Sequence, residues 1–203
     1  MTHILEELPL DALPPFGAYG RAGEPGVVAV LREDVGFATL TARKGGIPAL
    51  KVSVAAGFGL ALPDGPRAVG GPDLALLGTA PGRWLAVSQT RVDLAGDLIG
   101  ALGGHATVTE QSDALIACDL SGPRVLDLLA KGVAIDLHPE VFKSCDVTVT
   151  DIAHIGATLW RTNEDAWRLL VARSFAPAFL RFLIVSAAEY GIRLDPQANT
   201  GRG

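Results

Sequence analysis

Cysteine is scarce in this sequence, and an excess of basic residues is absent. Cys118 and Cys145 are the two cysteines among 203 residues, too few and too far apart for a disulfide framework or a zinc knuckle. We expect both to be reduced thiols in the core. Lysine and arginine number 17 against 22 acidic residues, and the resulting net charge of -5 removes the electrostatic attraction that drives nucleic-acid binding. The sequence therefore predicts no nucleic-acid partner.

Long hydrophobic runs are also missing. A membrane helix needs roughly 20 consecutive apolar residues. The best candidate, residues 175–188, is shorter than that and contains Arg181. The first ten residues carry Glu6 and Glu7 and no lysine or arginine, whereas a secretory signal begins with positive charge. We therefore expect a cytoplasmic protein with no membrane partner.

Apolar residues are plentiful by comparison. Hydrophobic residues make up 49% of the chain and charged residues 19%, against about 25% charge in an ordinary soluble domain. A chain of this length can bury about 70% of the surface of its unfolded form, as one domain or two small ones. A globally disordered chain is therefore not expected.

Apolar periodicity predicts one order of elements twice: strand, helix, hairpin, helix, strand. The first half contains strands at 27–31 and 37–42, a helix at 47–56, a hairpin of 73–78 and 83–88, a helix at 91–102 and a strand at 105–110. The second half contains a strand at 114–120, a helix capped by Ser121 and ended by Gly132, strands at 145–152, 155–161 and 167–172, a helix capped by Ser174, and a strand at 192–194. This order predicts an α+β fold of two tandem ferredoxin-like (split βαβ) halves, with helices on one face of antiparallel sheets.

The predicted domains are an extended N-terminal arm at 1–26, a first half at 27–112, a second half at 113–195 and a disordered tail at 196–203. The density of proline and glycine in the arm argues against regular structure there. The arm is too apolar for a solvated linker, so we expect it to pack on another surface, and a second chain is one candidate.

The final predicted helix is apolar around nearly its whole circumference, from Phe175 to Ala188. Such a helix is buried on more than one side. Two explanations stay open: it lies between the two halves of this chain, or it forms an obligate interface with another chain.

Chemical motifs are few. Histidines 3, 105, 138 and 154 lack the spacing of a metal site. His138 lies between Asp136 and Glu140, where it is either a poised base or, as we prefer, a loop residue beside a capping aspartate. The run Gly57-Phe58-Gly59 follows a helix, so it is not a dinucleotide loop. We predict no catalytic, cofactor-binding or metal-binding residues in this chain.

One stretch resembles a known family. The run SGPRVLDLLAKGVAIDLHP at 121–139, followed by Phe142, is similar to the gamma subunit of heterotetrameric sarcosine oxidase. Segments in the order of that family are Phe58–Pro63, the Trp84 strand, Glu110–Asp113, Leu159–Arg161 and Leu169–Ala176, so the resemblance covers roughly residues 30–195.

The resemblance implies a fold like the folate-binding domain of aminomethyltransferases, which agrees with the two predicted halves. It implies a structural subunit without catalytic residues of its own, with alpha, beta and delta chains as partners. The complex demethylates sarcosine to glycine and yields hydrogen peroxide, with formaldehyde or 5,10-methylenetetrahydrofolate. FAD, FMN, NAD, tetrahydrofolate and zinc would be carried by the other chains, and none by this one.

Two other functions stay open at this stage. A stand-alone folate-binding enzyme of the aminomethyltransferase kind would use a carboxylate such as Asp113 or Asp119 to orient the amine. A homo-oligomer would instead pair the apolar final helix with itself, and self-association of the isolated chain is left open for the same reason.

Overall fold

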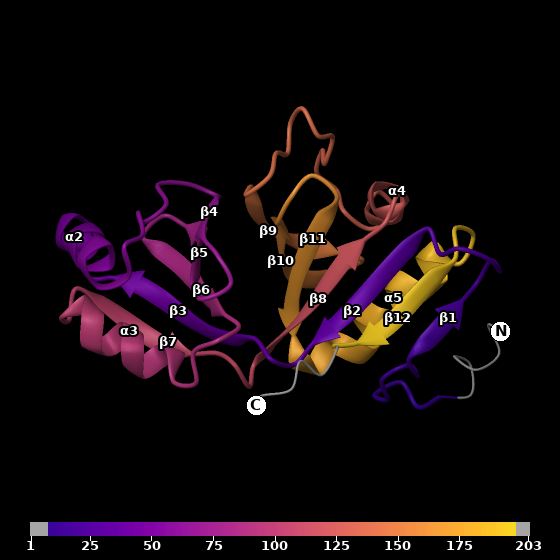
Figure 1. Cartoon of the computed structure of the whole chain (residues 1–203), viewed down its shortest axis with the longest axis horizontal. Helices are drawn as coiled ribbons and strands as arrows, with labels where there is room; N and C mark the ends of the chain where they lie inside the picture. Colours follow the sequence, from indigo (N-terminus) through magenta and orange to yellow (C-terminus); the bar gives the residue numbers. More distant parts are fainter. Residues whose placement is uncertain (1–7, 198–203) are drawn as a thin grey trace. The chain divides into compact units, whose positions relative to one another are not determined.

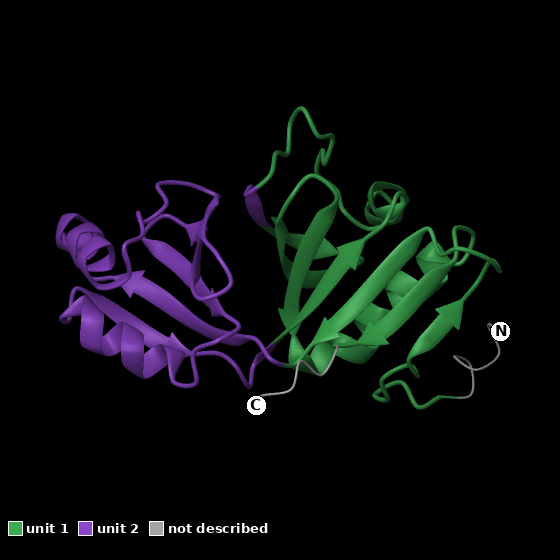
Figure 2. Cartoon of the chain, in the orientation of Figure 1, with its two compact units in different colours: residues 1–33, 116–144, 149–203 green, residues 34–115, 145–148 purple. Residues whose placement is uncertain are grey.

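The computed structural model describes residues 8–197, which fall into two compact units (Figure 2). Unit 1 comprises residues 1–33, 116–144 and 149–203, and unit 2 comprises residues 34–115 and 145–148. Most of the tail predicted to be disordered, residues 198–203, lies outside the described residues, and so does His3. At the start of that tail, Pro196 ends a strand, so the prediction of disorder is wrong for this residue. Among the described residues, no helix combines the length and apolar content needed to cross a membrane.

Unit 2 has the predicted ferredoxin-like order (Figure 1). Its elements are β3 (Gly36–Ala42), α2 (Ile47–Phe58), β4 (Ala68–Gly70), β5 (Ala75–Ala80), β6 (Arg83–Ser88), α3 (Leu94–Leu102) and β7 (Ala106–Glu110). The strands form an antiparallel sheet in the order β4-β5-β6-β3-β7. Leu94, Leu98 and Leu102 follow the four-residue spacing of one helix face, and they join the core formed with α2 and the sheet.

Unit 1 is built around a sheet of seven strands in the order β1-β12-β2-β8-β11-β10-β9. Its elements are β1 (Gly17–Tyr19), β2 (Val27–Arg32), β8 (Leu115–Ser121), α4 (Val125–Leu129), β9 (Val147–Ile152), β10 (Ile155–Arg161), β11 (Ala166–Ala172), the 3-10 turn η1 (Arg173–Phe175), α5 (Ala176–Ala187) and β12 (Ile192–Pro196). The core contains the buried faces of α4 and α5 together with alternate residues of the strands. Apart from β2, the four central strands and two helices have the split βαβ order, so the fold predicted for the second half is confirmed.

Strand β2 is where the compact units differ from the predicted halves. The sequence places residues 27–31 in the first half, but β2 pairs antiparallel with β8, with Ala29 opposite Leu120, and parallel with β12, with Val27 opposite Ile192. Unit 2 therefore begins after this strand. A pairing partner is set by tertiary structure, and periodicity along one strand carries no information about it.

The N-terminal arm contains more regular structure than the sequence predicts. Residues 17–19 form the edge strand β1 and pair antiparallel with β12. Further along, the backbone N–H of Arg21 donates to the carbonyl of Ala188 at 2.7 Å, and that of Gly26 donates to Tyr190 at 3.0 Å. The expectation of an irregular arm is thus wrong for these three residues, because an edge strand needs only a partner with open backbone groups.

The surface on which the arm packs is helix α5 of the same chain. One guanidinium nitrogen of Arg181 donates to the carbonyl oxygens of Leu8, Pro9 and Ala12, at 3.4, 2.5 and 3.5 Å. The buried residues of α5 all belong to the core of unit 1. The helix is therefore covered on one side by the core and on another by the arm, while Val185 is 61% exposed.

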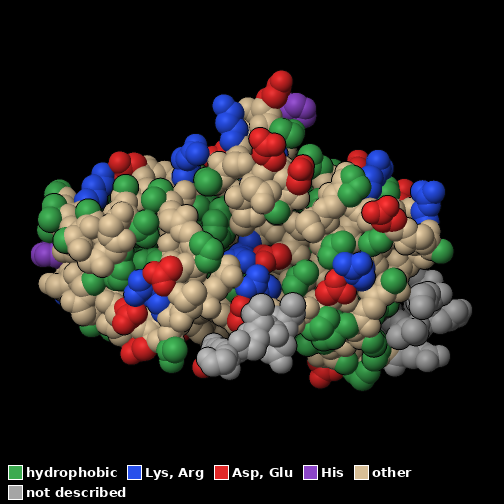
Figure 3. Space-filling model, in the orientation of Figure 1, with side chains coloured by type: hydrophobic (Ala, Val, Ile, Leu, Met, Phe, Trp, Pro, Cys, Tyr) green, Lys and Arg blue, Asp and Glu red, His purple; other side chains and the backbone are tan. Residues whose placement is uncertain are grey.

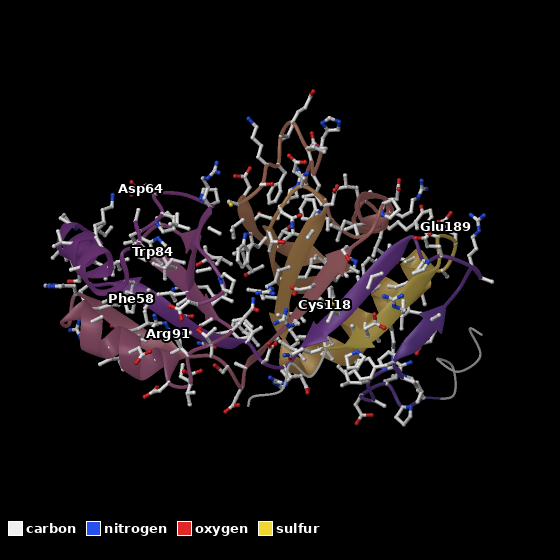
Figure 4. The ribbon with its side chains drawn as sticks, viewed as in Figure 1. Phe58, Asp64, Trp84, Arg91, Cys118 and Glu189 are labelled. Carbon is white, nitrogen blue, oxygen red and sulfur yellow. The ribbon has the colours of Figure 1, made fainter. Side chains whose placement is uncertain are left out.

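The two cysteines have different environments. Cys118 on β8 is buried, as predicted, and burial followed by the nearby Asp119 charge raises the pKa of its thiol far above the usual range (Figure 4). Cys145 is only half-buried and has a φ of 69° in a turn, so the prediction of a core thiol is wrong there. Both are free thiols.

We predict that Arg181→Ala loosens the arm, because one side chain provides the donor for three arm carbonyls. Hydrogen exchange measured by mass spectrometry is expected to accelerate in residues 8–19 and to stay unchanged in β8, β10 and β11. Arg83→Ala, an exposed arginine of unit 2, is the control. Unchanged exchange in the arm of the Arg181 variant would contradict this account.

Candidate functional site

A network of two arginines and one aspartate lies on the sheet of unit 1. The carboxylate of Asp119 on β8 accepts hydrogen bonds from Nε and one terminal nitrogen of Arg168 on β11, at 2.6 and 2.7 Å. It also accepts one from a terminal nitrogen of Arg32 on β2 at 3.1 Å. Because side chains alternate along a strand, Asp119 projects from the face opposite to the core residues Cys118 and Leu120. The network therefore joins three adjacent strands.

This geometry leaves Asp119 poorly suited to acid–base chemistry. Both of its oxygens accept charge-assisted hydrogen bonds, and Arg168 is only 5% exposed. A catalytic base needs an oxygen that can take a proton from substrate. Asp113, the other carboxylate considered for orienting an amine, lies in unit 2 and also has an interaction partner. The two carboxylates thus belong to different units.

A second buried guanidinium holds a long loop at residues 133–144, which we name the anchored loop. Arg161 donates to the carbonyls of Phe142, Asn163 and Glu164, at 2.6, 3.2 and 2.5 Å. The ring of Phe142 stacks on Trp167 with centroids 5.6 Å apart. Long irregular loops are usually mobile or functional, and these contacts fix the end of this loop to the core.

The tip of the anchored loop is also ordered by its own polar groups. Oδ1 of Asp136 accepts from the backbone N–H of His138 at 2.8 Å, and His138 Nδ1 accepts from that of Glu140 at 3.4 Å. The interpretation of Asp136 as a capping residue is therefore confirmed. Beneath the tip lies a groove of about 340 Å³, the loop groove, lined mainly by Leu126, Ala130, Val133, Ile135 and Leu137.

Lys131 and Gly132, which belong to the stretch 121–139 that carries the family resemblance, follow α4 and contact α5 and the residues after it. Lys131 Nζ donates to the carbonyl of Ser186 at 2.5 Å and to the carboxylate of Glu189 (Figure 4 labels Glu189). That hydrogen bond raises the pKa of Lys131 and lowers the pKa of Glu189. At Gly132, a Cβ would lie 2.4 Å from Cζ of the Phe182 ring, so a larger residue would require this ring on α5 to shift. This stretch is explained by packing.

Unit 2 contains a cavity of about 470 Å³ between the start of α2, the loop around Pro63 and the turn between β5 and β6. Trp84 Nε1 donates to the carbonyl of Pro63 at 2.8 Å, and Asp64 pairs with Lys51 at 2.6 Å (Figure 4). The polar groups of its wall are therefore paired within the chain. The cavity offers mainly apolar and backbone surface to a ligand.

The remaining motifs have structural explanations. Gly57 and Phe58 belong to the last turn of α2, and Gly59 is its left-handed C-cap, so the rejection of a dinucleotide loop is confirmed. The prediction that Ser121 and Ser174 cap helices is wrong: Ser121 ends β8, and Ser174 lies in the 3-10 turn before α5. Within residues 8–197, no three His, Cys, Asp or Glu side chains are arranged to hold a metal ion.

We predict that Asp119→Asn destabilises unit 1 by about 2–4 kcal/mol, a range reduced from that of a fully buried pair because the Asp119 side chain is 27% exposed. The change leaves the buried Arg168 guanidinium without its counter-charge. Arg168→Met is expected to cost less, since Asp119 keeps Arg32. Urea unfolding curves measure both, and a larger loss for the arginine variant would contradict this assignment.

We also predict that Arg161→Lys releases the anchored loop. A single ammonium cannot span the three carbonyls that the guanidinium fork reaches, and the loss is expected to be about 2 kcal/mol or more. Limited proteolysis should then cut within residues 133–144. Arg83→Lys on the surface is the matched control. Equal protease resistance in the Arg161 variant and in the unaltered protein would show that another contact holds the loop.

Residues 43–189 match the model of the sarcosine oxidase, gamma subunit family. The chain is 32% identical over 166 residues to sarcosine oxidase subunit gamma of Arthrobacter sp, covering 80% of this chain and 82% of the relative. It is 33% identical over 147 residues to the gamma subunit of Corynebacterium sp. (strain P-1), covering 72% and 71% of the two chains.

Solved structures agree with these matches. A chain of the heterotetrameric sarcosine oxidase from Corynebacterium sp. U-96, in complex with pyrrole 2-carboxylate, superposes with a TM-score of 0.74 at 31% identity. The match covers 83% of this chain and 87% of that chain. Aminomethyltransferase T of the Bartonella henselae glycine cleavage system matches with a TM-score of 0.60 at 15% identity, over 84% of this chain and 48% of that one, which shows a shared fold. The resemblance found in the sequence is thus confirmed, and this chain belongs to the sarcosine oxidase gamma subunit family.

Proposed function

We propose that this chain is the gamma subunit of a heterotetrameric sarcosine oxidase and serves it as a structural subunit without catalytic residues of its own. The complex would demethylate sarcosine oxidatively to glycine, producing hydrogen peroxide together with formaldehyde or 5,10-methylenetetrahydrofolate. The observation that carries the proposal is the match over 83% of this chain to a chain of such an oxidase at 31% identity.

The structural role is supported by how the polar groups are used. Asp119 is held by two arginines, and Arg161 is enclosed by carbonyls. His138 lies on an exposed loop, beside a carboxylate that caps the loop. Each of these groups stabilises the fold, and catalysis requires groups with free proton or electron-pair positions aimed at a substrate.

The partners of this chain would be the alpha, beta and delta chains of the oxidase, in the cytoplasm. FAD, FMN, NAD, tetrahydrofolate and zinc would be bound by those chains and none by this one. Partner chains are supported by the match to a chain of an oxidase that is heterotetrameric. No observation specifically favours a stand-alone aminomethyltransferase, since the likeness to that enzyme is one of fold.

We predict that co-expression with the other three oxidase chains yields one assembly containing this chain in equal proportion, measured by size-exclusion chromatography with light scattering. The assembly is expected to produce hydrogen peroxide from sarcosine, whereas the isolated chain produces none, because the residues that react lie in its partners. Titration of the isolated chain with tetrahydrofolate provides the comparison with the alternative. An isolated chain that ignores the other chains and transfers a one-carbon unit by itself would reject the proposal.

A further inference from the structure

The loop groove has the features of a preformed docking surface. Leu126 of α4 and Ile135 and Leu137 of the anchored loop give it an apolar floor and wall. Arg161 and the stack of Phe142 on Trp167 hold one end of the loop. At its start, Val133 bridges to Ile152 on β9. A partner would therefore meet a surface that needs little ordering, which reduces the entropic cost of binding.

Val133 and Leu137 of the lining are buried, whereas two other apolar side chains of the anchored loop are open to solvent. Ile135 is 38% exposed, and Val141 on the same loop is 60% exposed. The loop projects from unit 1 between α4 and β9 (Figure 1). Apolar groups on a rigid projecting loop are costly in water and become favourable when a partner covers them.

The charge around the groove indicates what kind of segment it accepts. Asp136 lines the groove, and Glu140 stands on the same loop with a strongly exposed carboxylate. Figure 3 shows acidic side chains, a histidine and a basic side chain on the projecting loop at the top of the view.

The basic residues closest along the chain are already engaged within it. Arg124 pairs with Asp127, and Lys131 pairs with Glu189. Lys143 also has an interaction partner. Asp136 and Glu140 outnumber Lys143 on the anchored loop, so the rim is net negative beside an apolar lining. The complementary partner places an aliphatic side chain in the groove and a lysine or arginine at the rim.

We propose that the loop groove is a contact site of this chain with another subunit of the oxidase, and that it receives an aliphatic side chain flanked by a basic residue from that subunit. This inference rests on the proposed function, because the partner is a chain of the same complex. A second copy of this chain would carry the same acidic rim and would be repelled.

Binding of the purified chain to the assembly of the other three subunits tests the site, with affinity and association rate measured by surface plasmon resonance. Ile135→Glu puts a charge into the groove and is expected to weaken binding by about tenfold or more. Asp136→Asn combined with Glu140→Gln keeps the loop cap and removes the rim charge. This pair is expected to slow association and to flatten its dependence on salt.

Val185→Glu is the matched control, since Val185 is an exposed valine on α5, outside the groove lining. It is expected to bind like the unaltered chain, and circular dichroism melts confirm that each variant is folded. If the unaltered chain fails to bind the other subunits, the proposed function fails. If it binds and Ile135→Glu binds equally well, only the groove proposal is overturned. Self-association that Ile135→Glu abolishes, without loss of binding to the other subunits, also overturns it.

Discussion

The position of β2 between β8 and β12 is the constraint on which both units depend. Arg32 at the end of β2 stands opposite Ala117 on β8, so the chain leaves unit 1 and returns to it at neighbouring points. The residues between can then form a complete ferredoxin-like unit without interrupting the larger sheet. Arg32 also contacts Asp119 on β8, so the same strand pair carries part of the buried ion network.

Two buried arginines stabilise unit 1 in different ways. Arg168 has a carboxylate partner and links adjacent strands, whereas Arg161 has carbonyl partners and links a strand to two loops. A buried charge with fixed partners is expensive to displace, because each partner loses a bond that water cannot replace there. The result is a sheet whose loop and neighbouring strands are fixed by buried hydrogen bonds.

The apolar surfaces divide into two groups, and the sequence indicated only the first, the arm and the final helix. The arm and the second side of α5 cover each other, through Arg181 and the carbonyls of the arm. Ile135 and Val141 on the anchored loop stay exposed although the loop itself is held in place. Hydrophobicity alone therefore did not distinguish apolar surface that this chain covers itself from apolar surface that stays exposed.

The sequence by itself determined the types of most elements, the two split βαβ orders and, through the stretch at 121–139, the family; it missed the short strands β1 and β4. These follow from local spacing: period-two and period-four patterns appear within one element, as with Leu94, Leu98 and Leu102. Tertiary structure alone decided that β2 joins unit 1, that the arm supplies an edge strand, and that Asp119 meets Arg32 and Arg168. Each of these is a contact between residues far apart in the chain, and it depends on which strands become neighbours, which no local pattern encodes.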